Sequence, residues 1–243
     1  MKIIKLDAID STNTFLKEMA VNSLLENFTV VVAKHQRLGR GQMNTEWNSE
    51  GGKNLTFSVF VRFSGLLVAN QKYLNFSVAI SVFEVLNDLK LSKVSIKWPN
   101  DILAEGMKIC GILIENSLKG NEIQSSVIGI GLNVNEPFLS NKQLKAVSIK
   151  DLLKEELELD FLLRELVLKL EKNIALLEKQ EYDLLEYRYL EVLHKKNVPS
   201  MFKTNQNVLF MGKIIGVSKD GKLQIELSDE TIKEFEIKEV SFA

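Results

Sequence analysis

Two glycines flank an arginine at residues 39–41, in a polar loop that follows the apolar run 29–35. Glycine lets the backbone approach an anionic ligand closely, so that its N–H groups can line that ligand. The guanidinium of Arg40 offers a charge-assisted fork to a phosphate or carboxylate. The alternative is a surface turn with a solvated arginine. The loop matches neither a P-loop, since no G-x-x-x-x-G-K-[ST] occurs, nor a dinucleotide fingerprint, since Asn44 replaces its third glycine.

A second polar group is the pentapeptide Lys97-Trp-Pro-Asn-Asp101, which follows an apolar run. Pro99 favours an extended conformation at Trp98, and the next two residues are turn formers. The sequence therefore predicts a tight turn that places a lysine and a carboxylate at a strand end. Lys108 starts another apolar strand, where a lysine must either extend its amine to solvent or meet an anion.

The apolar run 128–135 contains two glycines and two asparagines. A glycine inside a strand indicates close approach of a ligand or backbone, although a bulge explains it equally well. No Ser/His/Asp arrangement is evident, and the lone Cys110 is interpreted as a packing residue. One cysteine and two histidines argue against a structural zinc site, so we predict no metal held by the protein alone.

Composition and charge restrict the class of protein. The 243 residues carry a formal net charge of −1, with 45% hydrophobic and 26% charged residues, as in a globular protein with a substantial core. This balance gives no general nucleic-acid or membrane footprint. The sequence shows no signal peptide and no bilayer-spanning run, so we expect a cytoplasmic protein without membrane contact.

The pattern of elements predicts an α+β protein with two domains. Residues 2–9 and 54–62 read as strands, residues 69–89 as an amphipathic helix, and residues 160–195 as two helices broken near Gln180. The last 45 or so residues carry short strand-like runs and the hairpin signal Asp220-Gly221, which predict a small five-stranded, SH3-like barrel. We place a first domain at residues 1–195 and the barrel at 196–243. The four runs expected in the barrel are 208–210, 213–218, 222–227 and 231–237.

In order and spacing, the polar segments resemble the catalytic domain of the biotin protein ligases. The matching segments are Asp10-Ser-Thr-Asn13, Gln36-x-x-Gly-Arg-Gly41, Trp47 with Asn54-Leu55, Lys97-Trp-Pro-Asn-Asp101, Lys108-x-x-Gly-Ile-Leu-x-Glu115 and Gly129-x-Gly-x-Asn133. The resemblance implies a mixed β-sheet flanked by helices, with the SH3-like domain at the C-terminus. It also implies an ATP-dependent ligase that forms a biotinyl adenylate and transfers biotin to a lysine of a carrier protein.

The resemblance assigns roles to individual residues. Catalytic roles fall to Arg40, Lys97, Asp101 and Lys108, with Asp101 orienting the acceptor amine. Biotin contacts fall to Ser11, Thr12, Asn13, Gln36, Gly39, Arg40, Gly41, Lys108, Gly111 and Ile112. Nucleotide contacts fall to Arg40, Gln42, Trp47, Asn100, Lys108 and Asn133. The implied ligands are biotin and ATP with Mg²⁺, and the implied partner is the biotin carboxyl carrier domain of a carboxylase.

This chain departs from the family pattern at Gln42, where many members carry a second arginine, and the lost charge should weaken the hold on phosphate. The chain begins at the catalytic strand without the winged helix-turn-helix of the repressor members, so we expect no DNA partner. A homodimer is compatible with the resemblance. Two alternatives stay open, a lipoate–protein ligase with the same fold and chemistry, and a non-catalytic nucleic-acid-binding module.

Overall fold

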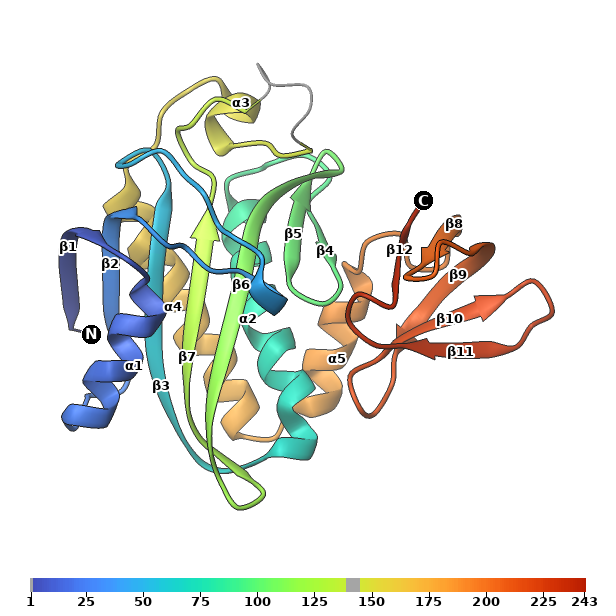
Figure 1. The fold of residues 1–243 in the computed structure, drawn as a ribbon, viewed down its shortest axis with the longest axis horizontal. Helices are drawn as coiled ribbons and strands as arrows, with labels where there is room; N and C mark the ends of the chain where they lie inside the picture. The colour runs from blue at the N-terminus through green and yellow to red at the C-terminus, as the bar shows by residue number, and fades with distance from the viewer. Residues whose placement is uncertain (1, 139–144) are drawn as a thin grey trace.

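The computed structural model describes residues 2–138 and 145–243, which form two β-sheets and the helices that cover the larger one (Figure 1). In spatial order, the larger sheet contains β1 (Ile3–Ile9), β2 (Thr29–Gln36), β3 (Leu55–Leu67), β7 (Glu122–Leu132), β6 (Met107–Lys119), β5 (Asp101–Ala104) and β4 (Ser95–Lys97). The pair β1–β2 is parallel and the other neighbours are antiparallel, so the predicted mixed sheet is confirmed.

Helices lie on both faces of the larger sheet (Figure 1). One face carries α1, and the other is covered by α2, α4 and α5, which pack against one another. The helices are α1 (Thr12–Asn22), α2 (Gln71–Asp88), α3 (Ile149–Leu153), α4 (Leu159–Glu178) and α5 (Tyr182–Glu191), with single 3₁₀ turns at η1 (Gln42–Asn44) and η2 (Val68–Asn70). The break predicted near Gln180 is confirmed. In the described part of the chain, no helix has the length and apolarity needed to cross a membrane.

Local sequence explains the start of α1 and the turn between β5 and β6. Ser11 is the N-cap of α1, and its hydroxyl accepts a hydrogen bond from the backbone N–H of Thr14. The turn between β5 and β6 places Glu105 and Gly106 at φ 51° and 76°. Two consecutive positive φ values suit the twist of a tight antiparallel hairpin, which is why the pair Glu105-Gly106 favours this connection.

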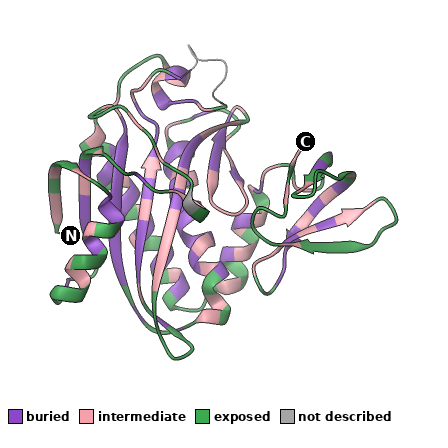
Figure 2. Ribbon diagram, viewed as in Figure 1, coloured by how far each residue is buried: buried purple, intermediate pink, exposed green. Residues whose placement is uncertain are grey.

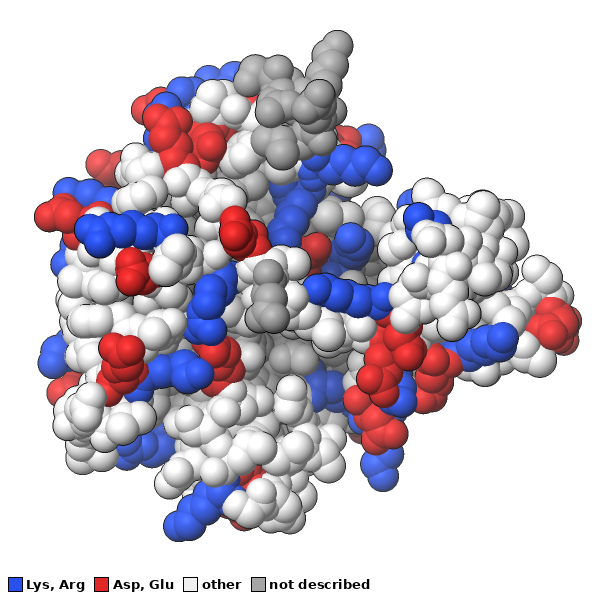
Figure 3. All heavy atoms as spheres, viewed as in Figure 1, with Lys and Arg blue, Asp and Glu red and all other residues white. Residues whose placement is uncertain are grey.

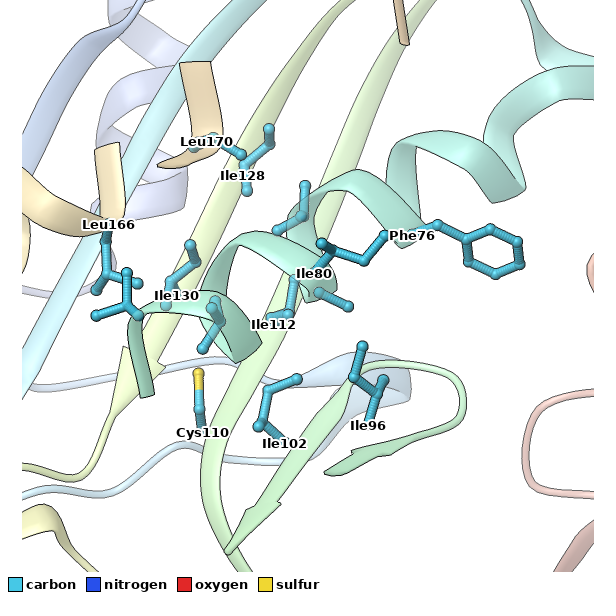
Figure 4. Close-up of a cluster of buried hydrophobic side chains, with 14 of the residues drawn as sticks. Phe76, Ile80, Ile96, Ile102, Cys110, Ile112, Ile128, Ile130, Leu166 and Leu170 are labelled. Atoms are coloured by element: carbon cyan, nitrogen blue, oxygen red, sulfur yellow. The ribbon is translucent and has the colours of Figure 1, made fainter. Parts of the chain in front are cut away.

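The core lies between the larger sheet and α2, α4 and α5 (Figures 2 and 4). Figure 4 shows side chains of α2, α4, β6 and β7 meeting there, among them Phe76, Ile80, Leu166, Leu170, Ile112, Ile128 and Ile130. The amphipathic pattern predicted for residues 69–89 is wrong for most of α2, in which only Gln71, Asn87 and Asp88 are exposed. The reason is that α2 is covered by the sheet on one side and by α4 and α5 on the other.

The second sheet confirms a separate five-stranded unit at the C-terminus, but two of its strands were not predicted. Its spatial order is β11 (Ile232–Phe235), β10 (Leu223–Leu227), β9 (Leu209–Val217), β8 (Pro199–Thr204) and β12 (Val240–Phe242). The predicted runs 208–210 and 213–218 merge into β9, whereas β8 and β12 lacked a recognised pattern. Both are short; β8 pairs with β9 and β12, and β12 pairs with β8. The domain boundary between residues 195 and 196 stays a prediction, and it falls between α5 and β8.

Candidate active site

A cavity of about 460 Å³ opens between the α1 face of the larger sheet and the C-terminal sheet. Figure 3 shows the hollow between the two parts of the molecule, with Lys and Arg side chains gathered around it. A cavity of this size is in the range of sites for small organic ligands. The predicted site residues that line it are Ser11, Thr12, Asn13, Gln36, Arg40, Gly41, Gln42, Trp47, Lys97, Asn100, Asp101, Lys108, Gly111 and Ile112.

Neutral polar side chains form a hydrogen-bond network at the α1 end of the cavity. The Oε1 of Gln36 accepts bonds from the backbone N–H and the hydroxyl of Thr12, at 2.8 and 3.0 Å. The hydroxyl of Ser58 lies 2.7 Å from that of Thr12 and 2.5 Å from Oδ1 of Asn13. Thr12, Asn13 and Ser58 are buried, so their geometry is held by packing as well as by these bonds. This end of the cavity is suited to a neutral ligand group with both donors and acceptors.

Glu115 joins this hydrogen-bond network to Arg40. One carboxylate oxygen of Glu115 accepts bonds from Nδ2 of Asn13 and from the guanidinium of Arg40, both at 2.9 Å, and the other accepts from Lys17 at 2.9 Å. Burial raises the pKa of Glu115, but the hydrogen bonds from Asn13 and Lys17 and the charge of Arg40 outweigh it and lower the pKa below its ordinary value. Glu115 is therefore an anion that holds Arg40 at the cavity wall.

The loop that carries Arg40 is a short hairpin-like arm rather than an irregular turn. The N–H of Trp47 donates to the carbonyl of Gly39 at 2.9 Å, and the N–H of Gly41 donates to the carbonyl of Thr45 at 2.7 Å. A β-carbon at Gly39 would lie 2.2 Å from the carbonyl oxygen of Trp47, and one at Gly41 would lie 2.4 Å from Oγ1 of Thr45. Glycine is required at position 39 because the clash there is with backbone, whereas a β-carbon at position 41 would force the side chain of Thr45 to move.

The indole of Trp47 rests on two glycines that face each other across β6 and β7. Gly111 pairs with Gly131, and a β-carbon at Gly131 would lie 2.4 Å from Cε2 of Trp47. The close approach predicted at residues 128–135 is made by side chains of the protein rather than by a ligand or backbone: Trp47 at Gly131, and Asn13 at Gly129, where a β-carbon would lie 2.3 Å from Oδ1. The register shifts of β7 with β3 and β6 lie near Leu66 and Leu118. The ammonium of Lys108 lies 5.7 Å from the centre of the same indole ring.

Lys97, Asp101 and Lys108 form a compact charged group on the neighbouring wall. The ammonium of Lys108 lies 2.6 Å from Oδ1 of Asp101, and that of Lys97 lies 3.9 Å from Oδ2. The backbone N–H of Ile112 donates to the carbonyl of Asn100, and the side-chain amide of Asn100 donates to the carbonyl of Ile112 at 2.6 Å. The turn 97–101, which includes a cis peptide bond before Pro99, is thereby fixed to β6.

The C-terminal sheet forms a wall of the cavity that the sequence did not indicate. Trp98 connects the two parts, since its indole N–H donates to the carbonyl of Gly221 at 3.1 Å. No local signal distinguished the residues of the C-terminal wall from ordinary strand and turn residues. The wall residues that were missed are Phe202, Leu223, Ile237, Lys238, Val240, Ser241 and Phe242, and on the other walls Thr45, Glu46, Phe57 and Ile130. The motif segments already contained Trp98, Pro99, Leu113, Gly129 and Gly131, but no ligand contact was assigned to them. Ser58 was also missed; it does not line the cavity but belongs to the hydrogen-bond network behind Thr12.

Two predicted ligand contacts lie outside the cavity lining. Gly39 acts through the shape of the arm, as described above. Asn133 is buried, its side-chain amide donates to the carbonyl of Val147 at 3.2 Å, and its own carbonyl accepts from the N–H of Ile149. Asn133 therefore holds the segment before α3 against β7, and its predicted contact with the nucleotide stays a prediction.

The site combines a neutral recognition end with a cationic end. Arg40, Lys97 and Lys108 can stabilise negative charge on a carboxylate or phosphate that enters the cavity, and the partly enclosed walls strengthen such interactions.

Within residues 2–138 and 145–243, no cluster of three or more His, Cys, Asp or Glu side chains could hold a metal ion. Cys110 is fully buried in the core, and burial raises the pKa of its thiol, so it is not a nucleophile.

This fold and site are those of a protein ligase, and residues 6–133 match the biotin/lipoate A/B protein ligase family. The chain belongs to that family. A bifunctional ligase/repressor from Bacillus subtilis is 29% identical over 92% of this chain and 69% of its own length. A biotin–[acetyl-CoA-carboxylase] ligase from Paracoccus denitrificans is 35% identical over 51% of each chain. The structure of a biotin protein ligase from Aquifex aeolicus in complex with biotin and ATP superposes with a TM-score of 0.79 at 25% identity, covering 100% of this chain and 98% of that one.

Proposed function

We propose that this protein is a biotin–protein ligase, which activates biotin with ATP as biotinyl-5′-AMP and then transfers the biotinyl group to a lysine of a carrier protein. One observation carries the proposal. A single cavity joins the neutral hydrogen-bonding chain of Gln36, Thr12 and Ser58 to the cations Arg40 and Lys108. Biotin has the matching polarity, with a neutral ureido group at one end and a carboxylate at the other.

In the first step, a carboxylate oxygen of biotin attacks the α-phosphorus of ATP. A phosphorus–oxygen bond forms, and the bond to the departing pyrophosphate breaks. The step brings two anions together, so it needs positive charge that is already in place. Arg40 and Lys108 supply this charge. Arg40 pairs with Glu115 at 2.9 Å and Lys108 pairs with Asp101 at 2.6 Å, and the ligand anions compete with these carboxylates for the two cations. Trp47 and Asn100 are proposed to contact the nucleotide beside them.

Magnesium is proposed to accompany the nucleotide, where it neutralises phosphate charge. The donor set fits this arrangement rather than a protein-held ion, because the described residues contain no cluster of three or more metal-ligating side chains. Mg²⁺ typically keeps several waters and is bound by substrate phosphates with only one or two carboxylates. Asp101 and Glu46 are the acidic side chains in the lining that could take that part.

In the second step, the ε-amine of the carrier lysine attacks the carbonyl carbon of the adenylate. An amide bond forms, AMP leaves, and the nitrogen loses a proton. The amine must be neutral to attack, although the usual pKa of lysine is about 10.4. Asp101 is the proposed orienting group, because its carboxylate lies on the cavity wall between Lys97 and Lys108.

The proposed protein partner is the biotin carboxyl carrier domain of a carboxylase. The name of the Paracoccus relative, a biotin–[acetyl-CoA-carboxylase] ligase, supports this choice. A homodimer and a cytoplasmic location stay predictions from the sequence. Sedimentation of the protein with and without biotin and ATP measures its oligomeric state.

The deciding experiment incubates the protein with biotin, MgATP and an apo carrier domain, followed by intact mass measurement of the carrier. We expect the mass to rise by one biotinyl group, with one AMP released per carrier modified. Reactions that lack ATP, or contain a carrier whose acceptor lysine is changed to arginine, are the controls. Lipoate in place of biotin tests the other branch of the family. Transfer of lipoate but not biotin would replace this proposal with a lipoate–protein ligase.

A further inference from the structure

A lysine of the C-terminal sheet reaches across the mouth of the cavity. The ammonium of Lys238 donates to the backbone carbonyl of Met43, in the arm that carries Arg40, at 2.9 Å. Lys238 follows β11 in a tight turn closed by a 3.1 Å bond from the N–H of Glu239 to the carbonyl of Glu236, and its φ is 67°. Lysine rarely adopts a positive φ. The turn thus holds this side chain toward the cavity, whose lining includes it.

Lys238 differs from the other cations in the lining by its partner. Arg40, Lys97 and Lys108 each have a carboxylate within 4.0 Å, either Glu115 or Asp101. In the part of the chain that the structure describes, Lys238 has no carboxylate within that distance, and its ammonium donates instead to the neutral carbonyl of Met43. The positive charge of Lys238 is therefore not balanced by a counter-charge of the protein.

The carboxylates next to Lys238 in the sequence are already engaged. Glu236 pairs with Lys222 at 2.9 Å, and the carboxylate of Glu239 accepts a bond from the backbone N–H of Glu236 at 2.7 Å. A charge-assisted hydrogen bond to a phosphate oxygen is about twice as strong as one between neutral groups. An anionic ligand at the cavity mouth would therefore compete well with the Met43 carbonyl for Lys238.

We propose that Lys238 binds the β- and γ-phosphates of ATP and exchanges its contact with Met43 for them when the nucleotide enters. The proposal rests on the function proposed above and adds a polyphosphate-binding residue from the C-terminal sheet. Lys238 is exposed at the mouth, which suits a leaving group that must depart to solvent. Gln42, directly beside Met43, carries no charge, so Lys238 supplies positive charge at this part of the arm.

The test compares Lys238→Met with Lys238→Arg, and with Lys233→Met as the matched control. Methionine matches the unbranched apolar stem of lysine without the ammonium and keeps the backbone cost of the positive φ. Lys233 is an exposed lysine of β11 outside the cavity lining. For Lys238→Met we expect the KM for ATP and the Kd for inorganic pyrophosphate to rise about tenfold, as for the loss of one charge-assisted bond. The affinities for biotin and AMP should change by less than about twofold, since neither ligand carries those phosphates.

Lys238→Arg should retain most of the affinity for ATP and pyrophosphate, and Lys233→Met should behave as the unaltered protein. Two results of the binding measurements would overturn the proposal. Unchanged pyrophosphate binding in Lys238→Met means that Lys238 does not contact the polyphosphate. Equal losses for biotin, AMP and ATP mean that the contact with Met43 only holds the arm in place.

Failure of the proposed function is a separate outcome. Pyrophosphate binding is measured by calorimetry without turnover, so it reports on Lys238 even if no adenylate forms. An unaltered protein that makes no biotinyl adenylate contradicts the proposed function. Normal ATP dependence with slower transfer from preformed adenylate in Lys238→Met would assign Lys238 to the carrier domain and overturn the inference.

Discussion

Trp47 and Gly131 are in such close contact that a β-carbon on the glycine would lie 2.4 Å from Cε2 of the indole. Gly131 faces Gly111 across β6 and β7, and together they form a flat floor for the ring. The tryptophan comes from the arm of Arg40, whereas the floor belongs to the sheet. This contact therefore sets the position of the arm over the cavity.

We predict that Gly131→Ala displaces Trp47 and raises the KM for ATP by about tenfold or more, because the overpacked ring costs about 1–3 kcal/mol. Steady-state kinetics and tryptophan fluorescence measure the two effects. Gly216→Ala in β9 is the control, since its β-carbon would be 3.5 Å from the nearest side-chain atom, an ordinary contact. Unaltered kinetics in Gly131→Ala would mean that the ring position does not matter for the nucleotide.

Asp101→Asn should slow the transfer step by about tenfold or more while adenylate formation falls less. Asparagine keeps the shape but removes the charge that faces Lys108 at 2.6 Å and orients the acceptor amine. Formation of the adenylate is followed by pyrophosphate release, and transfer by single turnover from preformed adenylate to the carrier. Equal losses in both half-reactions contradict the role assigned to Asp101.

Thr12→Val should weaken biotin binding by about tenfold without a comparable change for ATP. The substitution keeps the shape of the side chain and removes the hydroxyl that links Gln36 to Ser58. Breaking a buried polar network leaves its other members without partners, at a cost of about 1–3 kcal/mol. Calorimetric titration with biotin measures the effect. Thr56→Val is the control, because its hydroxyl is buried and bonded to the carbonyl of Ala33 outside the cavity lining.

Glu115 should make part of the free energy of unfolding depend on pH. Its pKa in the folded protein is lowered from the ordinary value of 4.5, so its ionised form is preferred by the folded state. The stabilisation is fully present above pH 4.5 and is lost as the pH falls through the lowered pKa. Glu115→Gln should therefore be less stable at neutral pH, and its deficit should shrink on acidification.

Urea denaturation at a series of pH values between neutrality and acid measures this difference. Glu122→Gln, at the exposed start of β7, is the control for the loss of a surface carboxylate. A deficit in Glu115→Gln that is the same at every pH would contradict the ion-pair explanation and indicate a packing defect.

Local chemistry made several features predictable from the sequence. The cap at Ser11, the turn at Glu105-Gly106 and the alternating strands depend on neighbouring residues, so their signals are contained in short segments. The motif residues around Gln36, Arg40, Lys97 and Lys108 were also recognisable by type and spacing. The structure assembles these residues around one cavity.

Only the tertiary structure decided what surrounds those residues. The burial of α2 on nearly all sides, the bond between Ser58 and Thr12, and the pairing of Gly111 with Gly131 under Trp47 join segments that are distant in the sequence. Lys238 illustrates the same limit, because nothing in its neighbourhood marks it, and its contact with Met43 spans 195 positions. Periodicity and spacing describe one element at a time, whereas packing between elements determines which side chains share a cavity.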